Sequence, residues 1–282
     1  MDFLPKSSVV LLLSLLVSAP ARAQTPIPNG RANNGDDNDS VEGAVLSNID
    51  LSRPFSTREA WRFIATQGPP EDDALFGGEE PGRIQLCLRA TRSAPCDPQL
   101  LNALSAASSA GNFFTQPHYL NAVKIVYPRG SADQPLLFVQ TASLHAGNSS
   151  QLVLTQVLAY KNSQNRFVRI YQYTTGTNNN DEVRYISSGR LKGDIISVDP
   201  TENAPYGYWM TVNVLTPQYT YKTVLRYRSA THYRDNNPLA VIDSEMPNIE
   251  QRLGYWKSGM ALPLPSGACP RPRLIRMELW CN

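Results

Sequence analysis

The fold is decided by two β-type runs and the polar turn between them, in residues 151–173, QLVLTQVLAYKNSQNRFVRIYQY. Gln151–Tyr160 and Arg166–Tyr173 are rich in Val, Leu, Ile and Tyr, which favour strands, and KNSQN is a turn cluster. A short connection joins antiparallel neighbours, because parallel strands need long crossovers. The first run is apolar on both faces, so we expect it to be a central strand.

The same pattern continues on both sides of this hairpin. Strand-like runs alternate with turn clusters such as TTGTNNND and DPTENAP over residues 122–230. The other expected strands are Ala122–Tyr127, Leu136–Leu144, Glu182–Ser188, Asp194–Val198, Tyr206–Leu215 and Tyr219–Arg228. The sequence therefore predicts a mainly β protein, an antiparallel up-and-down meander that forms a curled or barrel-like sheet, with a β-sandwich as the alternative.

The last run of the meander shows two different faces. Its core face is predicted to consist of Tyr219, Tyr221, Thr223, Leu225 and Tyr227. The other face carries Lys222, Arg226 and Arg228 together with Val224. Alternation of this kind is typical of an antiparallel sheet with one face on the core and one face in water, so we expect a wet basic face here.

The residues before the meander, 55–115, are expected to form a largely helical part. Ser56 and Glu59 have the spacing of a capping box, so a helix is predicted from Ser56 through Trp61 and Phe63 to the Gly-Pro-Pro that begins at Gly68. A strand is predicted over Arg83–Arg89 and a second helix over Gln99–Ala110.

After the meander, residues 231–282 are expected to form a helix, a loop and a closing strand. The helix is predicted over Met246–Leu253, with Pro247 in its first turn and a glycine at its exit. The alternating residues Arg273–Cys281 are predicted to be the closing strand. Residues 50–282 would then be one mainly β domain with two or three short peripheral helices.

The first residues have the layout of a secretory signal peptide. Lys6 gives a positive start, Ser8–Val17 is an apolar core, and Ala21-Arg22-Ala23 is a small-x-small cleavage site, so cleavage is predicted after Ala23. The apolar run is shorter than the roughly 20 residues that span a bilayer, and no later segment is long and apolar enough. Export to a periplasmic or secreted location, with no transmembrane segment, is the expectation.

Residues 24–49 are poor in core-forming side chains and are predicted to be a disordered linker. The acidic run NNGDDNDS at Asn33–Ser40 has some of the carboxylates and amides of a calcium loop, but the spacing matches no complete loop. The formal net charge is +2, of which about +1 lies in the leader. A near-neutral mature chain argues against nucleic acid as a partner, because phosphate binding needs a concentrated basic surface.

Four cysteines follow the leader, and an exported chain meets an oxidising compartment where an even number favours disulfides. Of the three possible pairings we expect Cys87–Cys96 and Cys269–Cys281, because short loops close at the lowest entropic cost. A metal site is the weaker alternative, since neither pair has the close spacing of zinc ligands. No metal and no cofactor is expected.

The densest polar cluster supplies the candidate catalytic residues. His232 lies near Asp235, Asp243 and Glu245, and a histidine beside carboxylates can act as a general base. The structural alternative is ordinary turn chemistry around Asp235 and charge complementarity at a helix start for Asp243 and Glu245. Ser244 lacks a nucleophile-elbow motif, and no phosphate-binding or dinucleotide-binding glycine motif is present.

Aromatic side chains concentrate in the last third of the chain. A rim of Tyr and Trp can hold a sugar or a peptide by stacking and hydrogen bonding, and the alternative role for the same residues is a tyrosine-rich sheet core. The candidate ligand-binding residues are Tyr206, Tyr208, Trp209, Tyr227 and Tyr233.

The sequence therefore favours a secreted or periplasmic, non-catalytic binding protein whose partner is a cell-envelope component, such as a glycan or a peptide, or a partner protein. A hydrolase that uses His232 with the nearby carboxylates is the alternative. A third hypothesis is an assembly factor that pairs a sheet edge with an incoming strand.

Overall fold

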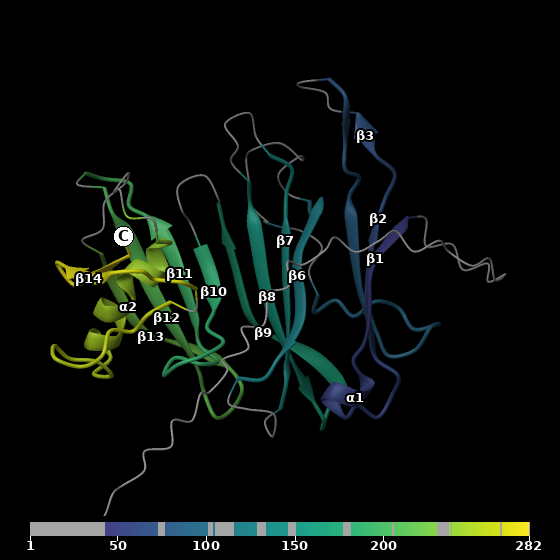
Figure 1. Cartoon of the computed structure of the whole chain (residues 1–282). Coiled ribbons are helices and arrows are strands. Elements are labelled where there is room, and N and C mark those ends of the chain that lie inside the picture. Colours follow the sequence, from purple (N-terminus) through teal and green to yellow (C-terminus); the bar gives the residue numbers. More distant parts are fainter. Residues whose placement is uncertain are drawn as a thin grey trace, which may run out of the picture. The chain divides into compact units, whose positions relative to one another are not determined.

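The chain is mainly β and its strands pair antiparallel, as the sequence predicts (Figure 1). The computed structural model describes residues 43–72, 77–100, 104, 116–128, 134–145, 151–176, 182–204, 206–229, 237, 239–265 and 267–281. None of the helices formed by these residues is long and apolar enough to cross a membrane.

Three sheets contain most of the strands. The N-terminal sheet has the order β1-β2-β5, with β1 at Ala44–Asp50, β2 at Arg62–Gln67 and β5 at Ile84–Arg89. The central sheet has the order β6-β7-β8-β9, with strands at Tyr119–Val126, Leu136–Ala142, Val153–Lys161 and Arg166–Thr175. The C-terminal sheet has the order β10-β11-β12-β13, with strands at Glu182–Tyr185, Ile195–Pro200, Tyr208–Leu215 and Tyr221–Arg228.

The remaining elements are short. The hairpin β3–β4 consists of Glu71–Asp72 and Glu79–Glu80, and the hairpin β14–β15 consists of Pro272–Ile275 and Glu278–Cys281. The described residues contain two helices, α1 at Ser52–Phe55 and α2 at Val241–Arg252.

The meander exists, but it is divided between two open sheets. Strands β6 to β13 follow one another in chain order, and hydrogen-bonded pairing is interrupted between β9 and β10. Each four-stranded sheet therefore has two edge strands, and the described strands do not form a closed barrel.

The inner strands of the central sheet, β7 and β8, are buried on both faces by other parts of the chain. Leu137, Val139 and Leu158 share one hydrophobic cluster with residues of the N-terminal sheet such as Phe63 and Leu88. The neighbouring residues along the same strands, Leu136, Phe138 and Val157, belong to another cluster that includes residues of the C-terminal sheet. Because successive side chains of a strand point to opposite faces, this explains why every residue of β8 except the last, Lys161, is buried.

Tyrosines join the central sheet to the C-terminal sheet. We call Tyr171 and Tyr173 of β9, Tyr185 of β10 and Tyr221 of β13 the tyrosine seam. The rings of Tyr171 and Tyr221 meet edge to face with centroids 5.5 Å apart, and the Tyr173 hydroxyl donates to Asp199 Oδ2 of β11 at 2.6 Å. Burial is the main cause that raises the pKa of all four side chains, to about 12 for Tyr185.

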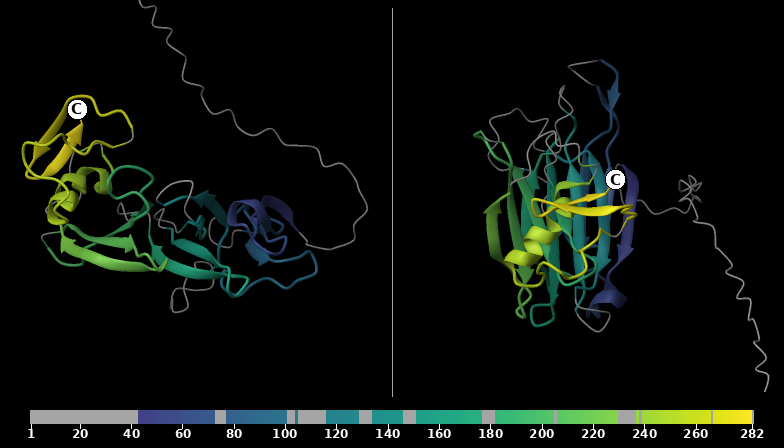
Figure 2. Two further views of the ribbon diagram at one scale, coloured as in Figure 1. Left: turned by 90° about the horizontal axis from the view of Figure 1, so that it is seen from below. Right: turned by 60° about the vertical axis from the view of Figure 1, so that its left-hand side comes forward.

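The C-terminal sheet has one face covered by α2. Ile196, Val198, Met210 and Val212 of the sheet form a hydrophobic cluster with Ile242 and Ile249 of the helix. Figure 2 shows the helix between this sheet and the hairpin β14–β15. The opposite face of the sheet carries the alternate residues of the same strands, and the tyrosine seam covers part of it.

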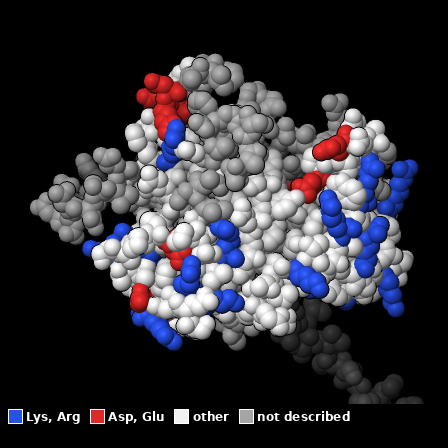
Figure 3. Space-filling view, turned by 180° about the vertical axis from the view of Figure 1, so that it is seen from behind, with Lys and Arg blue, Asp and Glu red and all other residues white. Residues whose placement is uncertain are grey.

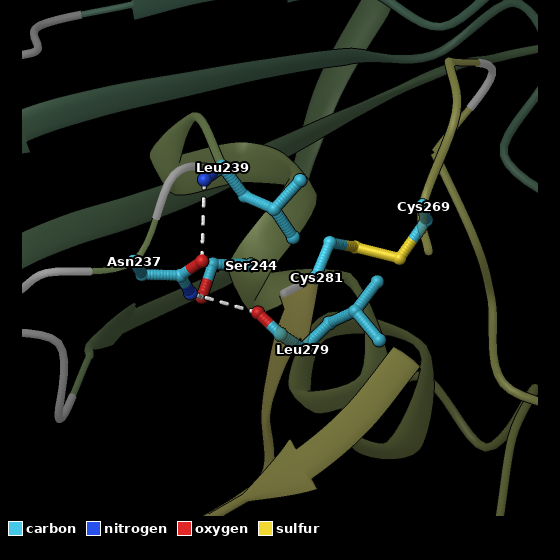
Figure 4. Close-up of a disulfide and its surroundings, with 6 residues drawn as sticks. All are labelled: Asn237, Leu239, Ser244, Cys269, Leu279 and Cys281. Atoms are coloured by element: carbon cyan, nitrogen blue, oxygen red, sulfur yellow. Dashed lines mark hydrogen bonds between the residues drawn. A yellow bond between two sulfur atoms is a disulfide. The ribbon is translucent and has the colours of Figure 1, made fainter. Parts of the chain in front are cut away.

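The two disulfides form with the predicted pairing, Cys87–Cys96 and Cys269–Cys281, and no free cysteine remains. The first closes the loop that follows β5. The second connects the end of β15 to the loop that precedes β14 (Figure 4). Disulfides are typical of proteins that fold in an oxidising compartment.

The helix predicted from Ser56 is wrong. Helix α1 ends at Phe55, Ser56 has a left-handed backbone with φ 48°, and Arg62–Gln67 form strand β2. In this strand Phe63 and Ala65 are fully buried, and β1 and β5 pair with its two edges. Pairing on both sides and burial of alternate residues therefore outweigh the local capping signal. The predicted strand at Arg83–Arg89 is confirmed, whereas most of the helix predicted over 99–110 lies outside the described residues.

The predicted linker over 24–49 is too long. Ala44–Asp50 form β1, which pairs with β2 although all of its residues are exposed or half-buried. Backbone hydrogen bonds to a buried neighbour thus order a segment whose composition is poor in core residues. Residues 24–42, and the signal peptide, lie outside the described residues.

The C-terminal elements differ from the prediction in two ways. Helix α2 begins at Val241, so Pro247 lies inside the helix and not in its first turn. The predicted single strand over 273–281 is the hairpin β14–β15, because Arg276 and Met277 both adopt positive φ, at 51° and 72°, and reverse the chain. A two-residue turn of this kind usually contains Asn or Gly. Because this turn contains neither residue, the sequence did not predict the hairpin.

The tyrosine seam predicts a loss of stability at alkaline pH. Tyrosines of the unfolded chain ionise near pH 10, whereas the raised pKa values keep the seam protonated in the folded state. The folded state then binds more protons, so the free energy of unfolding should fall as the pH rises from about 10 to 12. For Tyr185 alone the expected loss is about 1 kcal/mol at pH 11.

Urea denaturation across this pH range measures the effect. The Tyr185→Phe variant removes one buried hydroxyl, which has no hydrogen-bond partner among the described residues, and its stability should fall less steeply with pH. An equally steep fall in the variant would contradict the role of Tyr185.

Candidate functional site

The carboxylates predicted for catalysis contact different partners. Asp243 Oδ1 accepts a hydrogen bond from Arg184 Nη1 at 2.6 Å, and the same guanidinium pairs with Glu182. Burial raises the pKa of Glu182, and Arg184 opposes this shift. Asp243 is thus one end of an ion-pair network that joins α2 to β10.

Glu245 is fully buried on another side of α2. Its Oε2 accepts hydrogen bonds from the Tyr227 hydroxyl at 2.6 Å and from Asn248 Nδ2 at 3.0 Å. The guanidinium of Arg252 lies over the Tyr227 ring, 4.2 Å from its centroid. Burial, followed by the nearby Glu245 charge, raises the pKa of Tyr227. This network holds the helix against β13, and Glu245 therefore has a structural role in it.

The histidines do not complete a catalytic group within the described residues. His232, Asp235 and Tyr233 lie outside them. His118 is buried, with Nδ1 2.6 Å from the carbonyl oxygen of Pro81, and His145 lies against the Tyr119 ring. In the part of the chain that the structure describes, no three His, Cys, Asp or Glu side chains are arranged to hold a metal ion.

Ser244 lies in a structural hydrogen-bond network beside the second disulfide (Figure 4). Asn237 Nδ2 donates to Ser244 Oγ and to the carbonyl oxygen of Leu279, both at 2.8 Å, while Asn237 Oδ1 accepts from the backbone of Leu239. The asparagine thereby links the start of α2 to β15. Among the described residues, no histidine or carboxylate takes part in this network.

The predicted ligand-binding aromatics divide between the two faces of the C-terminal sheet. Tyr208 and Tyr227 are buried in the cluster under α2 and therefore have the core role that the sequence also allowed. Trp209 is 36% exposed on the opposite face, and Tyr206 is exposed in the preceding loop. Of these residues, only Trp209 presents its ring on the open face of the sheet.

Strand pairing places charged residues beside Trp209. Asp199 of β11 and Arg228 of β13 are its direct partners on the neighbouring strands, and directly opposed side chains share one face of an antiparallel sheet. Arg226 lies two residues along β13, and its guanidinium carbon is 4.8 Å from the centroid of the Trp209 ring. The row Asp199–Trp209–Arg228 therefore crosses three adjacent strands.

These side chains border a hollow of about 420 Å³ that we call the Trp209 groove. Its other walls come from the loop after β11 and from the seam residue Tyr173, whose hydroxyl donates to Asp199. The lining residues are Tyr173, Asp199, Pro200, Thr201, Glu202, Asn203, Trp209, Arg226 and Arg228.

The groove combines two guanidinium groups with two carboxylates. Figure 3 shows Lys and Arg side chains gathered over the C-terminal sheet with acidic side chains beside them. Arg228 Nη2 donates to the carbonyl oxygen of Asn203 at 3.0 Å, which holds the loop wall against β13. Among the described residues, Arg226 has the Trp209 ring as its contact and has no ion-pair partner within 4 Å. Its planar donors can therefore receive an anionic group.

Sequence reasoning identified Trp209 and the basic face of β13 separately. It did not identify Asp199, Arg226 and Arg228 as neighbours of Trp209, because their proximity depends on the register of three strands. That register includes an irregularity between Val212 and Asn213, which no turn residue signals. Arg226 and Arg228 were the available signal. The predicted faces of β13 are only partly right, because the irregularity places Lys222 opposite Val214 on the α2 side of the sheet. It likewise places Tyr221 on the other face from Tyr227.

Comparisons with known proteins do not assign this chain to a family. No protein-family model matches it, and no curated protein is a significant match. The function is therefore inferred from the chemistry of the groove.

The Glu245 network predicts a stability effect of one hydroxyl group. Tyr227→Phe leaves the buried carboxylate with one donor fewer, which should lower the free energy of unfolding by about 1–3 kcal/mol. The matched control is Tyr255→Phe, on an exposed ring, with an expected change below about 0.5 kcal/mol. Denaturant unfolding of both variants at neutral pH measures the difference, and equal stabilities would show that the hydrogen bond to Glu245 contributes nothing.

Proposed function

We propose that this protein is an exported, non-catalytic binding protein that holds an acidic glycan of the cell envelope in the Trp209 groove. The observation that carries the proposal is the row Asp199–Trp209–Arg228, with the Arg226 guanidinium above the indole ring. It offers a planar aromatic edge, cationic donors and carboxylate acceptors within one hollow.

Each component of the groove matches a part of such a ligand. The exposed edge of the Trp209 ring can contact the apolar C–H groups of a sugar, and the carboxylate of Asp199 can accept hydrogen bonds from sugar hydroxyls. Guanidinium groups form strong, often bidentate, hydrogen bonds with carboxylates and phosphates. A sugar that carries an acidic substituent uses all three components, whereas a neutral sugar leaves the two arginines unused.

Export is the second part of the proposal. It is supported by the predicted signal peptide, with cleavage after Ala23, and by the two disulfides, which are typical of an oxidising compartment.

A binding role is favoured over hydrolysis because the described carboxylates of the candidate catalytic set, Asp243 and Glu245, already bind groups that hold α2 against the sheet. Asp243 pairs with Arg184, and Glu245 accepts hydrogen bonds from Tyr227 and Asn248. Strand addition is less favoured for a different reason. The edge strand β13 carries exposed Lys222, Arg226 and Arg228, and charged side chains on an edge oppose pairing with another strand.

Calorimetric titration with two disaccharides tests the proposal. N-acetylglucosaminyl-N-acetylmuramic acid carries a carboxylate, and N,N′-diacetylchitobiose has a closely related N-acetylated backbone without one. We expect the acidic disaccharide to bind at least about tenfold more tightly, since a hydrogen bond to a charged group contributes about 1.5–3 kcal/mol. Binding of neither disaccharide, nor of an oligogalacturonate, would overturn the glycan proposal, and equal affinities would overturn its acid selectivity.

Variants of the groove locate the binding site. Arg226→Gln should weaken binding of the acidic disaccharide about tenfold or more while leaving the weak affinity for N,N′-diacetylchitobiose unchanged. Trp209→Ala should weaken both. Arg273→Gln makes the same change in net charge on the exposed strand β14 and should bind like the parent protein. If Arg226→Gln and Arg273→Gln behave alike, the ligand binds elsewhere.

A further inference from the structure

A second, smaller hollow lies beside α2 and shares no lining residue with the Trp209 groove. Its volume is about 180 Å³. Three sides of it come from the end of β10 and the loop that follows, from one face of α2, and from residues 263–265. We call it the α2 hollow.

One face of the helix supplies two carboxylates and a thioether to this hollow. Asp243, Met246 and Glu250 follow one another at intervals of three and four residues. Side chains with this spacing lie on the same face of an α-helix. Ile242, Glu245 and Ile249 point instead toward the sheet and the core cluster.

Glu250 is the unusual member of this set. Its residue is only 9% exposed, yet its carboxylate borders the hollow and receives no hydrogen bond or ion pair within 4 Å from the described residues. Arg190 is the nearest charge that acts on it, but a guanidinium nitrogen of Arg190 donates to the carbonyl oxygen of Tyr255. Burial raises the pKa of Glu250, and the Arg190 charge opposes the shift. A buried carboxylate without a partner is costly.

The other charged groups near the hollow leave its surplus charge negative. Arg184 is the cation that lines it, and this guanidinium is shared between Asp243 and Glu182. Arg190 acts on Glu250 from outside the lining, so two guanidinium groups face three carboxylates, those of Glu182, Asp243 and Glu250, and one negative charge is left over. An anionic ligand would be repelled, and a cation would find two carboxylates, Asp243 and Glu250, on the same wall.

Much of the remaining wall is apolar, and Ser187 and Ser188 add two hydroxyl-bearing side chains to it. Met246, Leu191 and Leu264 line the hollow together with prolines 263 and 265. These apolar side chains suit a chain of methylene groups, and the volume of about 180 Å³ is that of a small ligand. A hydrated metal ion would gain nothing from them.

We infer that the α2 hollow binds an aliphatic primary ammonium group, with the ammonium at Glu250 and Asp243 and the alkyl stem against Met246 and Leu264. Two sources share this chemistry, a free alkyl diamine and the lysine side chain of a peptide. The inference does not depend on the Trp209 groove, and it adds a second ligand class to the molecule.

Calorimetry or chemical-shift titration of the intact protein tests the inference with four probes. The cationic probes are 1,5-diaminopentane and Nα-acetyl-lysine methylamide. Their neutral counterparts are 1,5-pentanediol and Nα,Nε-diacetyl-lysine methylamide. We expect at least one cationic probe to bind at least tenfold more tightly than its counterpart. Binding of the diamine alone would identify a free amine as the ligand, whereas binding of the lysine derivative would identify a peptide side chain.

Two variants and a control connect binding to the hollow. Glu250→Gln keeps the side-chain shape, removes the unpaired charge and should weaken the cationic probe at least tenfold. Leu264→Lys introduces a tethered ammonium on an exposed loop residue and should compete with the probe to a similar extent. Glu79→Gln changes the net charge equally on the distant hairpin β3–β4 and should leave binding unchanged.

Several results would overturn the inference. These are failure of both cationic probes to bind at millimolar concentration, equal binding of the cationic and neutral probes, or unaltered binding in Glu250→Gln and Leu264→Lys. A thermal melt of each variant shows that it is folded, and none of these outcomes bears on binding of disaccharides at Arg226.

Discussion

Burial of both faces of β7 and β8 is the constraint on which the rest of the structure depends. Leu137 and Leu158 face the N-terminal sheet, while Leu136 and Val157 face the cluster that reaches the C-terminal sheet. A strand of this kind cannot remain at a surface without exposing a row of large apolar side chains. The N-terminal and C-terminal sheets are therefore held in place as the covers of one central pair of strands.

The candidate site follows from how the C-terminal sheet is covered. Helix α2 buries one face of that sheet, and the tyrosine seam buries part of the other. What remains open is the end of the second face, where Trp209, Arg226 and Arg228 stand with Asp199. The same helix creates the α2 hollow at its margin, since Asp243 and Glu250 turn away from the core cluster. One packing arrangement thus leaves two polar hollows of different charge.

The sequence is informative where the signal is local and periodic. The strands of the meander were predicted close to their observed limits, because alternation of side chains and turn clusters is encoded within each segment. The two short-range disulfides were also predicted, since loop closure depends on sequence separation. Local signals fail where strand pairing determines the structure of a segment. The capping box at Ser56 predicted a helix, but Arg62–Gln67 pair with two neighbouring strands.

The site was only partly predictable for the same reason. Trp209 and the basic face of β13 were visible as residue types, but their proximity to Asp199 depends on the pairing of three strands and on one irregularity in register. The burial of Glu250 depends on tertiary packing of α2 against β10 and residues 263–265, which no periodicity expresses. The sequence thus identifies which residue types are present, whereas the fold determines which charged side chains lie together in one hollow.

Native-state hydrogen exchange tests the central claim most directly. If the doubly buried strands hold the molecule together, the backbone amides of β7 and β8 should exchange most slowly, with protection close to the free energy of global unfolding, while those of the edge strands β1 and β14 exchange much faster. Exchange of the β8 amides as fast as those of β1 would contradict the account.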